Sequence, residues 1–271
     1  MPPTTSWSAL TGRASNQTSI ATTYILPEQI AYDTFSNGAA GAVITSRSGE
    51  QATWNAHPSY GSTFHLTSAS RAHLTSAVSH GCAYLSENTG ADYRMRARLR
   101  WVSDPSSGIF DGGVAVRSST TADTMYLMWW QNFTDPGVHL YRLVDGVGSD
   151  LTKITTLAEP TIGTNYDFDL QAYGSRITAT VSVAGVQLAQ IAASDTSITA
   201  AGRGALRAFN GGAGTDHTGL HFDDVNVYTF ASNVTSIATA AAPVPSWTAR
   251  ADVSSSWVAR SDSTASWVLR A

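Results

Sequence analysis

The chain has 271 residues, which is enough for one large all-β domain with a substantial core. Charged residues make up only 13% of it and the net charge is −4, so it lacks the basic field that supports non-specific nucleic-acid binding, and we expect no nucleic-acid partner. Its one cysteine, Cys82, excludes an intrachain disulfide and a thiolate metal cluster. It contains no apolar run of about 18 residues, so we expect no membrane span.

Three zones follow one another along the chain. Residues 1–27 are polar and rich in Thr and Ser, and we interpret them as an N-terminal arm; they lack the basic start and the apolar core of a signal peptide. Residues 28–231 hold a long series of strand-like runs and are predicted to form the folded domain. An Ala- and Pro-rich stretch, residues 232–245, is typical of a linker, and residues 246–271 are repetitive.

The middle zone alternates between apolar and polar residues in several places, which predicts antiparallel strands with one buried and one wet face. The alternation is clearest over residues 93–101, 167–173 and 177–183. Turn signals such as Ala184-Gly185 separate these runs. Many short strands without a helical period predict an all-β fold, an antiparallel jelly-roll β-sandwich.

The last strand is expected at residues 220–228. Phe222 and Val225 are both apolar but have opposite parity, so they cannot share one face of a regular strand. An extra residue near Asp223 and Asp224 would restore the phase, and we predict a β-bulge there.

Four arginines share the polar face of residues 93–101, and we name them the arginine row: Arg94, Arg96, Arg98 and Arg100. Like charges side by side on one strand face repel each other unless anions pair with them. Asp167 and Asp169 share a face of another predicted strand and could supply the carboxylates. Pairing within the chain or between subunits is favoured over an acidic glycan as the partner.

Two adjacent tryptophans, Trp129 and Trp130, lie in an apolar run and must face opposite sides of a strand. One indole therefore belongs to the core, while the other is either covered by packing or open. A covered indole is favoured; an open one beside Gln131 or Asn132 would be able to stack on a sugar ring. The glycan-binding candidates are Trp129, Trp130 and Asn132.

Residues 246–271 contain a ten-residue repeat with the pattern Ser-Trp-x-x-Arg, in three copies. So short and polar a segment cannot bury its own tryptophans, and it is suited to fold on binding a partner. Aromatic anchors dominate interface energies, so the predicted interface residues are Trp247, Arg250, Trp257, Arg260, Trp267 and Arg270.

A resemblance to a known family rests on five segments: residues 31–35 (AYDTF), 166–170 (YDFDL), 177–186 (ITATVSVAGV), 198–206 (ITAAGRGAL) and 222–227 (FDDVNV). Together they are similar to the concanavalin A-like (laminin-G/laminarinase-type) jelly rolls of bacteriophage tail and other virion proteins, over roughly residues 30–230. The resemblance implies the fold, but it does not separate lectins from glycosidases. It also implies a structural calcium ion at the matching positions Asp33 and Asp224, with turn or bulge hydrogen bonds as the alternative role of these residues.

Glycosidases with this fold carry paired glutamates a few residues apart on one strand. None of the four glutamates here has another within five residues. His57, His65, His73 and His80 recur at intervals of seven or eight residues, but the turn and strand signals between them are expected to scatter them. We therefore predict no catalytic residue and a protein that is not an enzyme.

The resemblance and the tail repeat favour a structural protein of a bacteriophage virion, located in the tail as a fibre, baseplate or adaptor and assembled in the host cytoplasm. Its expected partners are other virion proteins and copies of itself, docked through the tail repeat. A capsid decoration protein of the same fold and a module that binds host surface glycan are the alternatives, and a glycoside hydrolase ranks last. No cofactor is expected apart from the structural calcium.

Overall fold

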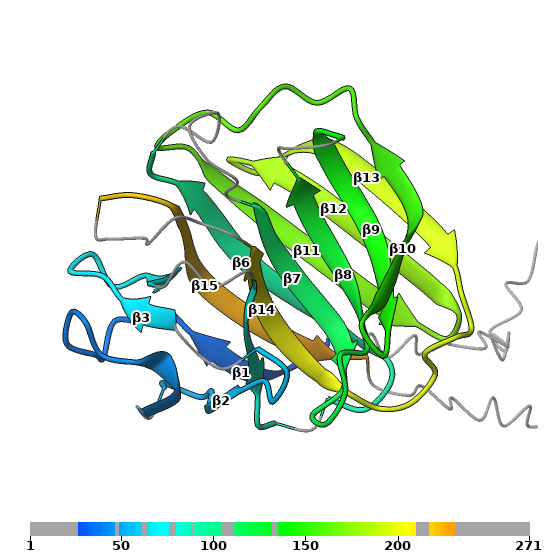
Figure 1. Cartoon of the computed structure of the whole chain (residues 1–271), viewed down its shortest axis with the longest axis horizontal. Helices are drawn as coiled ribbons and strands as arrows, with labels where there is room; N and C mark the ends of the chain where they lie inside the picture. Colours follow the sequence, from blue (N-terminus) through cyan, green and yellow to red (C-terminus); the bar gives the residue numbers. More distant parts are fainter. Residues whose placement is uncertain are drawn as a thin grey trace, which may run out of the picture. The chain divides into compact units, whose positions relative to one another are not determined.

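Two antiparallel β-sheets pack face to face as a jelly-roll β-sandwich in the computed structural model of the chain (Figure 1). The all-β class and the sandwich predicted from the alternation are confirmed. The structure describes residues 27–46, 49–60, 64–75, 80–87, 89–103, 111–131, 135–209 and 217–230. These residues contain one short 3₁₀ turn at Ile44–Ser46 and no α-helix, and none of them forms a helix long and apolar enough to cross a membrane.

Within these residues the first sheet has eight strands in the order β13-β12-β11-β6-β15-β4-β3, with β1 pairing on β15. Its strands are β1 (Glu28–Asp33), β3 (Phe64–Leu66), β4 (Ala72–Leu74), β6 (Tyr93–Trp101), β11 (Asn165–Tyr173), β12 (Arg176–Val183), β13 (Val186–Ser194) and β15 (Leu220–Thr229).

The second sheet has seven strands in the described part of the chain, in the order β10-β9-β8-β7-β14-β5-β2. Figure 1 shows β7 to β10 in front of β6 and β11 to β13 of the first sheet. Its strands are β2 (Trp54–Ala56), β5 (His80–Leu85), β7 (Asp111–Ser118), β8 (Met125–Gln131), β9 (Gly137–Val144), β10 (Val147–Ile154) and β14 (Arg203–Phe209).

The core lies between the two sheets and is lined by alternate residues of each strand. In β6 every second residue from Tyr93 to Trp101 is buried, and the arginine row lies on the outer face, as the alternation predicted. Trp101 packs edge-on against Trp130 of β8 with ring centroids 5.5 Å apart, and Trp130 stacks on Phe168 of β11 at 6.2 Å. Each such pair adds about 0.5–1.5 kcal/mol beyond its area burial, so this cluster ties the two sheets together.

Strand β15 contains the predicted bulge. Its register with β6 shifts between Asp223 and Asn226, and Asp224 adopts a φ of 46°. The extra residue lets Phe222 and Val225 both face the core, where each is fully buried. The prediction drawn from their opposite parity is confirmed.

Residues 1–26 and 231–271 lie outside the described residues. The boundaries of the N-terminal arm, the linker and the tail repeat therefore stay predictions.

Candidate functional site

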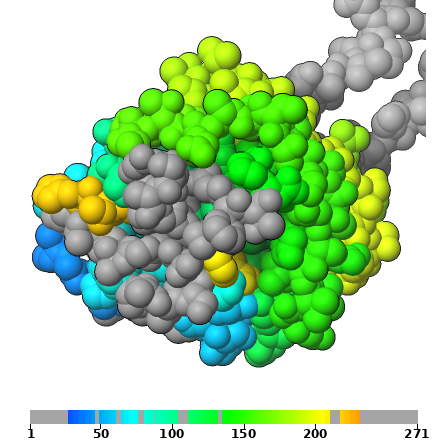
Figure 2. Space-filling model, turned by 45° about the horizontal axis from the view of Figure 1, so that its top comes forward, coloured from blue at the N-terminus to red at the C-terminus, as the bar shows by residue number. Residues whose placement is uncertain are grey.

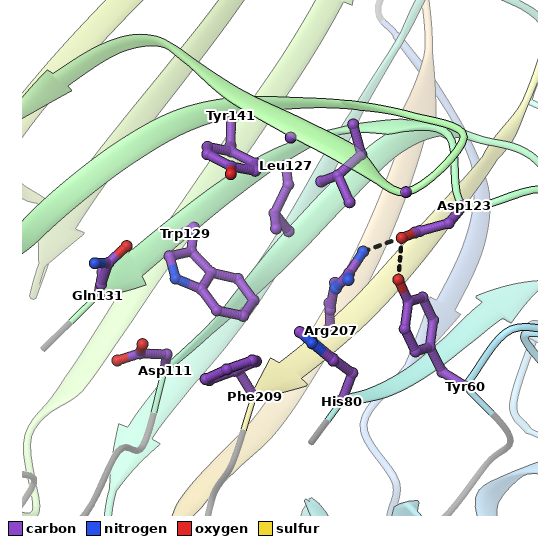
Figure 3. Close-up of a pocket in the computed structure, with 13 residues that line it drawn as sticks. Tyr60, His80, Asp111, Asp123, Leu127, Trp129, Gln131, Tyr141, Arg207 and Phe209 are labelled. Carbon is purple, nitrogen blue, oxygen red and sulfur yellow. Dashed lines mark hydrogen bonds and ion pairs between the residues drawn. The ribbon is translucent and has the colours of Figure 1, made fainter. Parts of the chain in front are cut away.

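A hollow of about 480 Å³ lies on the outer face of the second sheet, which is the face turned away from the core. Its lining comes from β5, β7, β8, β9, β10 and β14 and from connections between strands, as Figure 3 shows. Figure 2 shows the green chain segment that contains β8 to β10 over much of one side of the molecule. The volume of the hollow falls within the roughly 300–1,000 Å³ that is typical of small-molecule sites.

Strand β8 supplies the centre of the hollow, because its side chains alternate between the two faces of the sheet. Leu127, Trp129 and Gln131 line the hollow, whereas Trp130 is 2% exposed and packs in the core. The two tryptophans therefore face opposite sides, as predicted. The expectation that Trp130 could bind a glycan is wrong, since its indole is enclosed between the sheets. Asn132, the third candidate, lies outside the described residues.

Aromatic side chains surround Trp129. Its half-buried indole meets the ring of Phe209 from β14 edge to face, with centroids 6.0 Å apart. Tyr141 from β9 lies on the other side of Trp129 (Figure 3). Gly148 of β10 leaves room for that ring, because a Cβ atom there would lie 2.2 Å from Tyr141 Cε1. Trp129 and Tyr141 rest on an apolar layer made of Cys82, Ala115, Met125, Leu127, Leu143 and Ala205.

A buried ion pair closes one end of the hollow. Arg207 Nη1 of β14 donates to Asp123 Oδ1 at 2.9 Å, and the two side chains are only 4% and 7% exposed. The Tyr60 hydroxyl also donates to Asp123, and the guanidinium carbon of Arg207 lies 4.4 Å from the centre of the Tyr60 ring. Burial, followed by the hydrogen bond to Asp123, raises the pKa of Tyr60 to about 12, so this hydroxyl keeps the proton that it donates.

His80 of β5 lies beside this ion pair, with its ring centroid 5.2 Å from that of Tyr60 and 4.4 Å from that of Phe209. Burial, followed by the positive charge of Arg207, lowers the pKa of His80 to about 4, so the imidazole is neutral at pH 7. Its Nδ1 atom is buried and has no hydrogen-bond partner within the described residues. Such an atom costs about 1–3 kcal/mol until a ligand or a water satisfies it.

Gln131 and Asp111 form the opposite end of the hollow, beside the Trp129 indole (Figure 3). Gln131 is the last residue of β8, and Asp111 is the first residue of β7 and only 4% exposed. Next to the aromatic ring, the Gln131 amide can both donate and accept hydrogen bonds, and the Asp111 carboxylate can accept them.

Asp123 is not available as a general acid or base in this hollow. Both oxygens of Asp123 accept hydrogen bonds, one from Arg207 and one from Tyr60, so this carboxylate is committed to the fold. A general acid or base must instead be within reach of a proton on the substrate. The rest of the lining is an aromatic surface with polar groups at its two ends.

Neither a protein family nor a curated protein matches the sequence. Among solved structures, the exoplasmic/lumenal domain of VIP36 in its Ca²⁺/Man2-bound form has a TM-score of 0.50 and 9% identity, over 73% of this chain and 90% of that chain. That likeness agrees with the antiparallel jelly-roll sandwich described above. The carbohydrate-binding module CBM66 from Bacillus subtilis has a TM-score of 0.48 and 16% identity, over 65% of this chain and 95% of that one. Alginate lyase Aly36B has a TM-score of 0.48 and 16% identity, over 74% and 97%. At these identities the likeness concerns the fold alone.

The arginine row lies on the outer face of the first sheet, away from the hollow. Asp169 of the neighbouring strand β11 accepts hydrogen bonds from Arg94 and lies 3.6 Å from Nε of Arg96. Nε of Arg98 lies 3.2 Å from Asp167 in the same way. The register of β6 against β11 sets these pairs, and the carboxylates come from the same sheet as the arginines.

The predicted calcium site does not fit the two aspartates. Asp33 is fully buried; its Oδ2 accepts from Trp54 Nε1 at 2.8 Å and its Oδ1 from the backbone N of Phe35 at 2.8 Å. Asp224 instead pairs with Arg98 of the arginine row. The two carboxylates are thus engaged by different donors, in keeping with the alternative of turn and bulge hydrogen bonds. Within the described ranges no group of three or more His, Cys, Asp or Glu side chains is placed to hold a metal.

Two of the regularly spaced histidines come together, against expectation. The short strands β3 and β4 place His65 directly opposite His73, and β15 places His221 opposite His73 with ring centroids 5.5 Å apart. The spacing of the two in sequence matches a β-hairpin, which brings residues several positions apart face to face. His80 is the member of the series that lines the hollow.

The predicted interface lies outside the described residues: Trp247, Arg250, Trp257, Arg260, Trp267 and Arg270. Its role in assembly stays a prediction.

Proposed function

We propose that this chain is a glycan-binding protein and that a sugar ring stacks on Trp129 in the hollow of the second sheet. The observation that carries the proposal is the half-buried Trp129 indole at the centre of a hollow with polar groups at both ends. A pyranose presents an apolar C–H face and a rim of hydroxyl groups. The hollow offers an aromatic surface for the first and hydrogen-bonding groups for the second.

The polar groups around the indole match what a sugar needs. The amide of Gln131 both donates and accepts, and the carboxylate of Asp111 accepts. At the other end, the neutral imidazole of His80 lines the hollow beside the ion pair of Arg207 and Asp123.

The test compares two aromatic truncations in the full-length chain. Trp129→Ala removes the stacking surface, while Tyr173→Ala removes a 64% exposed aromatic side chain that does not line the hollow. An array of defined neutral and acidic glycans identifies a bound glycan, and calorimetry measures its Kd. We expect Trp129→Ala to weaken binding at least about tenfold, because a lost aromatic contact of about 1.4 kcal/mol corresponds to that factor.

The control decides between site-specific and general effects. Tyr173→Ala is expected to leave Kd within about twofold, because surface substitutions of this kind have small effects. Unchanged binding in Trp129→Ala, or equal losses in both variants, contradicts the proposal, provided that circular dichroism shows both variants folded.

We further propose that the chain displays this hollow as part of a bacteriophage virion, with the tail repeat as its assembly segment. The three copies of Ser-Trp-x-x-Arg support this role, because spaced aromatic residues in a polar segment suit docking to neighbouring subunits. Light scattering of the full-length chain against a version ending after Ala231 tests it. Loss of oligomers or of incorporation into particles on truncation supports the role, and unchanged assembly contradicts it.

A further inference from the structure

We infer that the hollow selects uncharged glycans and rejects acidic ones, because its cation is already neutralised inside the fold. The inference rests on the glycan-binding function proposed above and names the class of sugar. Recognition of a uronate, sialate or sulfate normally relies on an arginine or lysine that is free to form charge-assisted hydrogen bonds with the anion.

Arg207 is the single Arg or Lys among the described residues that line the hollow. Its guanidinium donates to Asp123 at 2.9 Å, covers the Tyr60 ring at 4.4 Å and lies 3.7 Å from the sulfur of Met125. The residue is 3% exposed. Its charge is balanced by Asp123, so an incoming anion would have to displace that carboxylate, whose other oxygen accepts from the Tyr60 hydroxyl.

The other titratable groups that face the hollow do not supply a replacement cation. His80 is neutral at pH 7, since burial and Arg207 hold its pKa near 4. Asp111 adds a second carboxylate, and no cation, to the lining. On the neighbouring strand β10, Lys153 is already paired with Asp135 and Asp150.

An uncharged sugar meets none of these obstacles. Its hydroxyl groups bond to polar groups of the lining such as Gln131, while its ring stacks on Trp129. An acidic sugar of the same shape would lose the hydration of its carboxylate in a hollow that offers no unpaired cation among the described residues. The arrangement therefore discriminates by charge at a site whose shape accepts both sugars.

The first experiment uses the wild-type full-length chain and pairs of glycans that differ only in the acid. Oligosaccharides of glucose against those of glucuronate, and galactose-terminated chains against their sialylated forms, serve as probes. We expect the neutral member of each pair to bind at least about tenfold more tightly. A preference for the acidic member, or equal binding, overturns this inference and leaves glycan binding intact. Binding of neither kind overturns both.

The second experiment frees the cation. Asp123→Asn keeps the size of the side chain and an oxygen for Tyr60 but removes the charge that balances Arg207. We expect the ratio of neutral to acidic affinity to fall at least about tenfold, with the new acidic binding weakened by salt. Asp169→Asn, which removes the partner of Arg94 on the opposite sheet, is the matched control and should leave the ratio unchanged.

An unchanged ratio in a folded Asp123→Asn variant overturns the inference. Circular dichroism and a urea titration establish whether the variant folds, because removing one member of a buried ion pair is destabilising. Where it does not fold, the comparison of neutral and acidic glycans on the wild-type chain decides the question without it.

Discussion

Replacing Arg117 should lower the free energy of unfolding strongly, because this buried side chain makes several hydrogen bonds. Arg117 is the second-last residue of β7, is 2% exposed and adopts a φ of 52°. Its guanidinium donates to the carbonyl oxygens of Ala91, Gly174 and Ile198, each at 2.7 Å, and to Asp92 at 3.2 Å. These partners lie in three connections far apart in sequence, so one side chain holds three loops against the edge of the sandwich.

The expected loss of stability follows from these contacts. Replacing Arg117 with Met keeps the apolar stem but removes the donors to three carbonyl oxygens. A hydrogen bond to a charged group contributes about 1.5–3 kcal/mol, and removing one partner from a buried charged network costs about 3–5 kcal/mol after relaxation. We therefore expect Arg117→Met to lower the free energy of unfolding by about 3–5 kcal/mol, a large part of the roughly 5–15 kcal/mol that a domain has.

Urea unfolding followed by circular dichroism measures this loss. Arg176→Met is the matched control, because Arg176 is exposed at the start of β12 and should change stability by less than about 0.5 kcal/mol. Equal m-values would show that both variants unfold from the same compact state. A loss below about 1 kcal/mol for Arg117→Met refutes the reasoning, because it would mean that water replaces the guanidinium at all three carbonyl oxygens.

Two further predictions concern the hollow. Gly148→Ala should weaken glycan binding severalfold without unfolding the chain, because the added Cβ displaces the Tyr141 ring. Tyr141→Ala should weaken binding to a similar extent, and calorimetry compares the Kd values of the two variants. His80 has its pKa lowered from 6.5 to about 4, so unfolding takes up a proton and its contribution to stability falls as the pH drops from about 6.5 towards 4. The stability of the wild type relative to His80→Gln, measured by urea unfolding, should therefore be lower at pH 4.5 than at pH 7, and a constant difference contradicts this.

Period-two alternation is the part of the fold that could be predicted from the sequence. It placed a strand over residues 93–101, and β6 spans the same residues. It also assigned the outer and inner faces of β11 and β12, which have one polar side. The rule works in these strands because burial on one face alone is a local property of consecutive residues. The bulge near Asp224 was predictable for the same reason, since it interrupts the alternation.

The hollow could not be predicted in this way, because its residues meet only through the order of the strands. Asp123 and Arg207 form their ion pair across 84 positions. Tyr60 reaches it from the connection that follows β2, and His80 reaches it from β5. No local pattern distinguishes Arg207 from any other arginine of a strand. A signal was present only in the alternation of residues 205–209, which places Arg207 on the face opposite the buried Leu206.

The orientation of Trp129 and Trp130 could be predicted only in part. Alternation required that Trp129 and Trp130 face opposite sides, and they do. It could not say which one belongs to the core, because β8 is apolar on both faces: its first four residues are all buried. A strand covered on both sides loses the polar face from which its orientation is read.

The two outer faces of the sandwich differ in a way that bears on function. On the first sheet, the arginine row and its carboxylates are between 12% and 42% exposed where they pair, so the charges stay hydrated and balance across neighbouring strands. On the second sheet, an apolar layer lies under Trp129, and the ion pair of Arg207 and Asp123 is almost fully buried. A face that only meets water gains nothing from an apolar layer or from a desolvated ion pair. Such a face is more stable when a ligand that is apolar on one side covers it, and this difference supports the proposal that the second sheet binds the ligand.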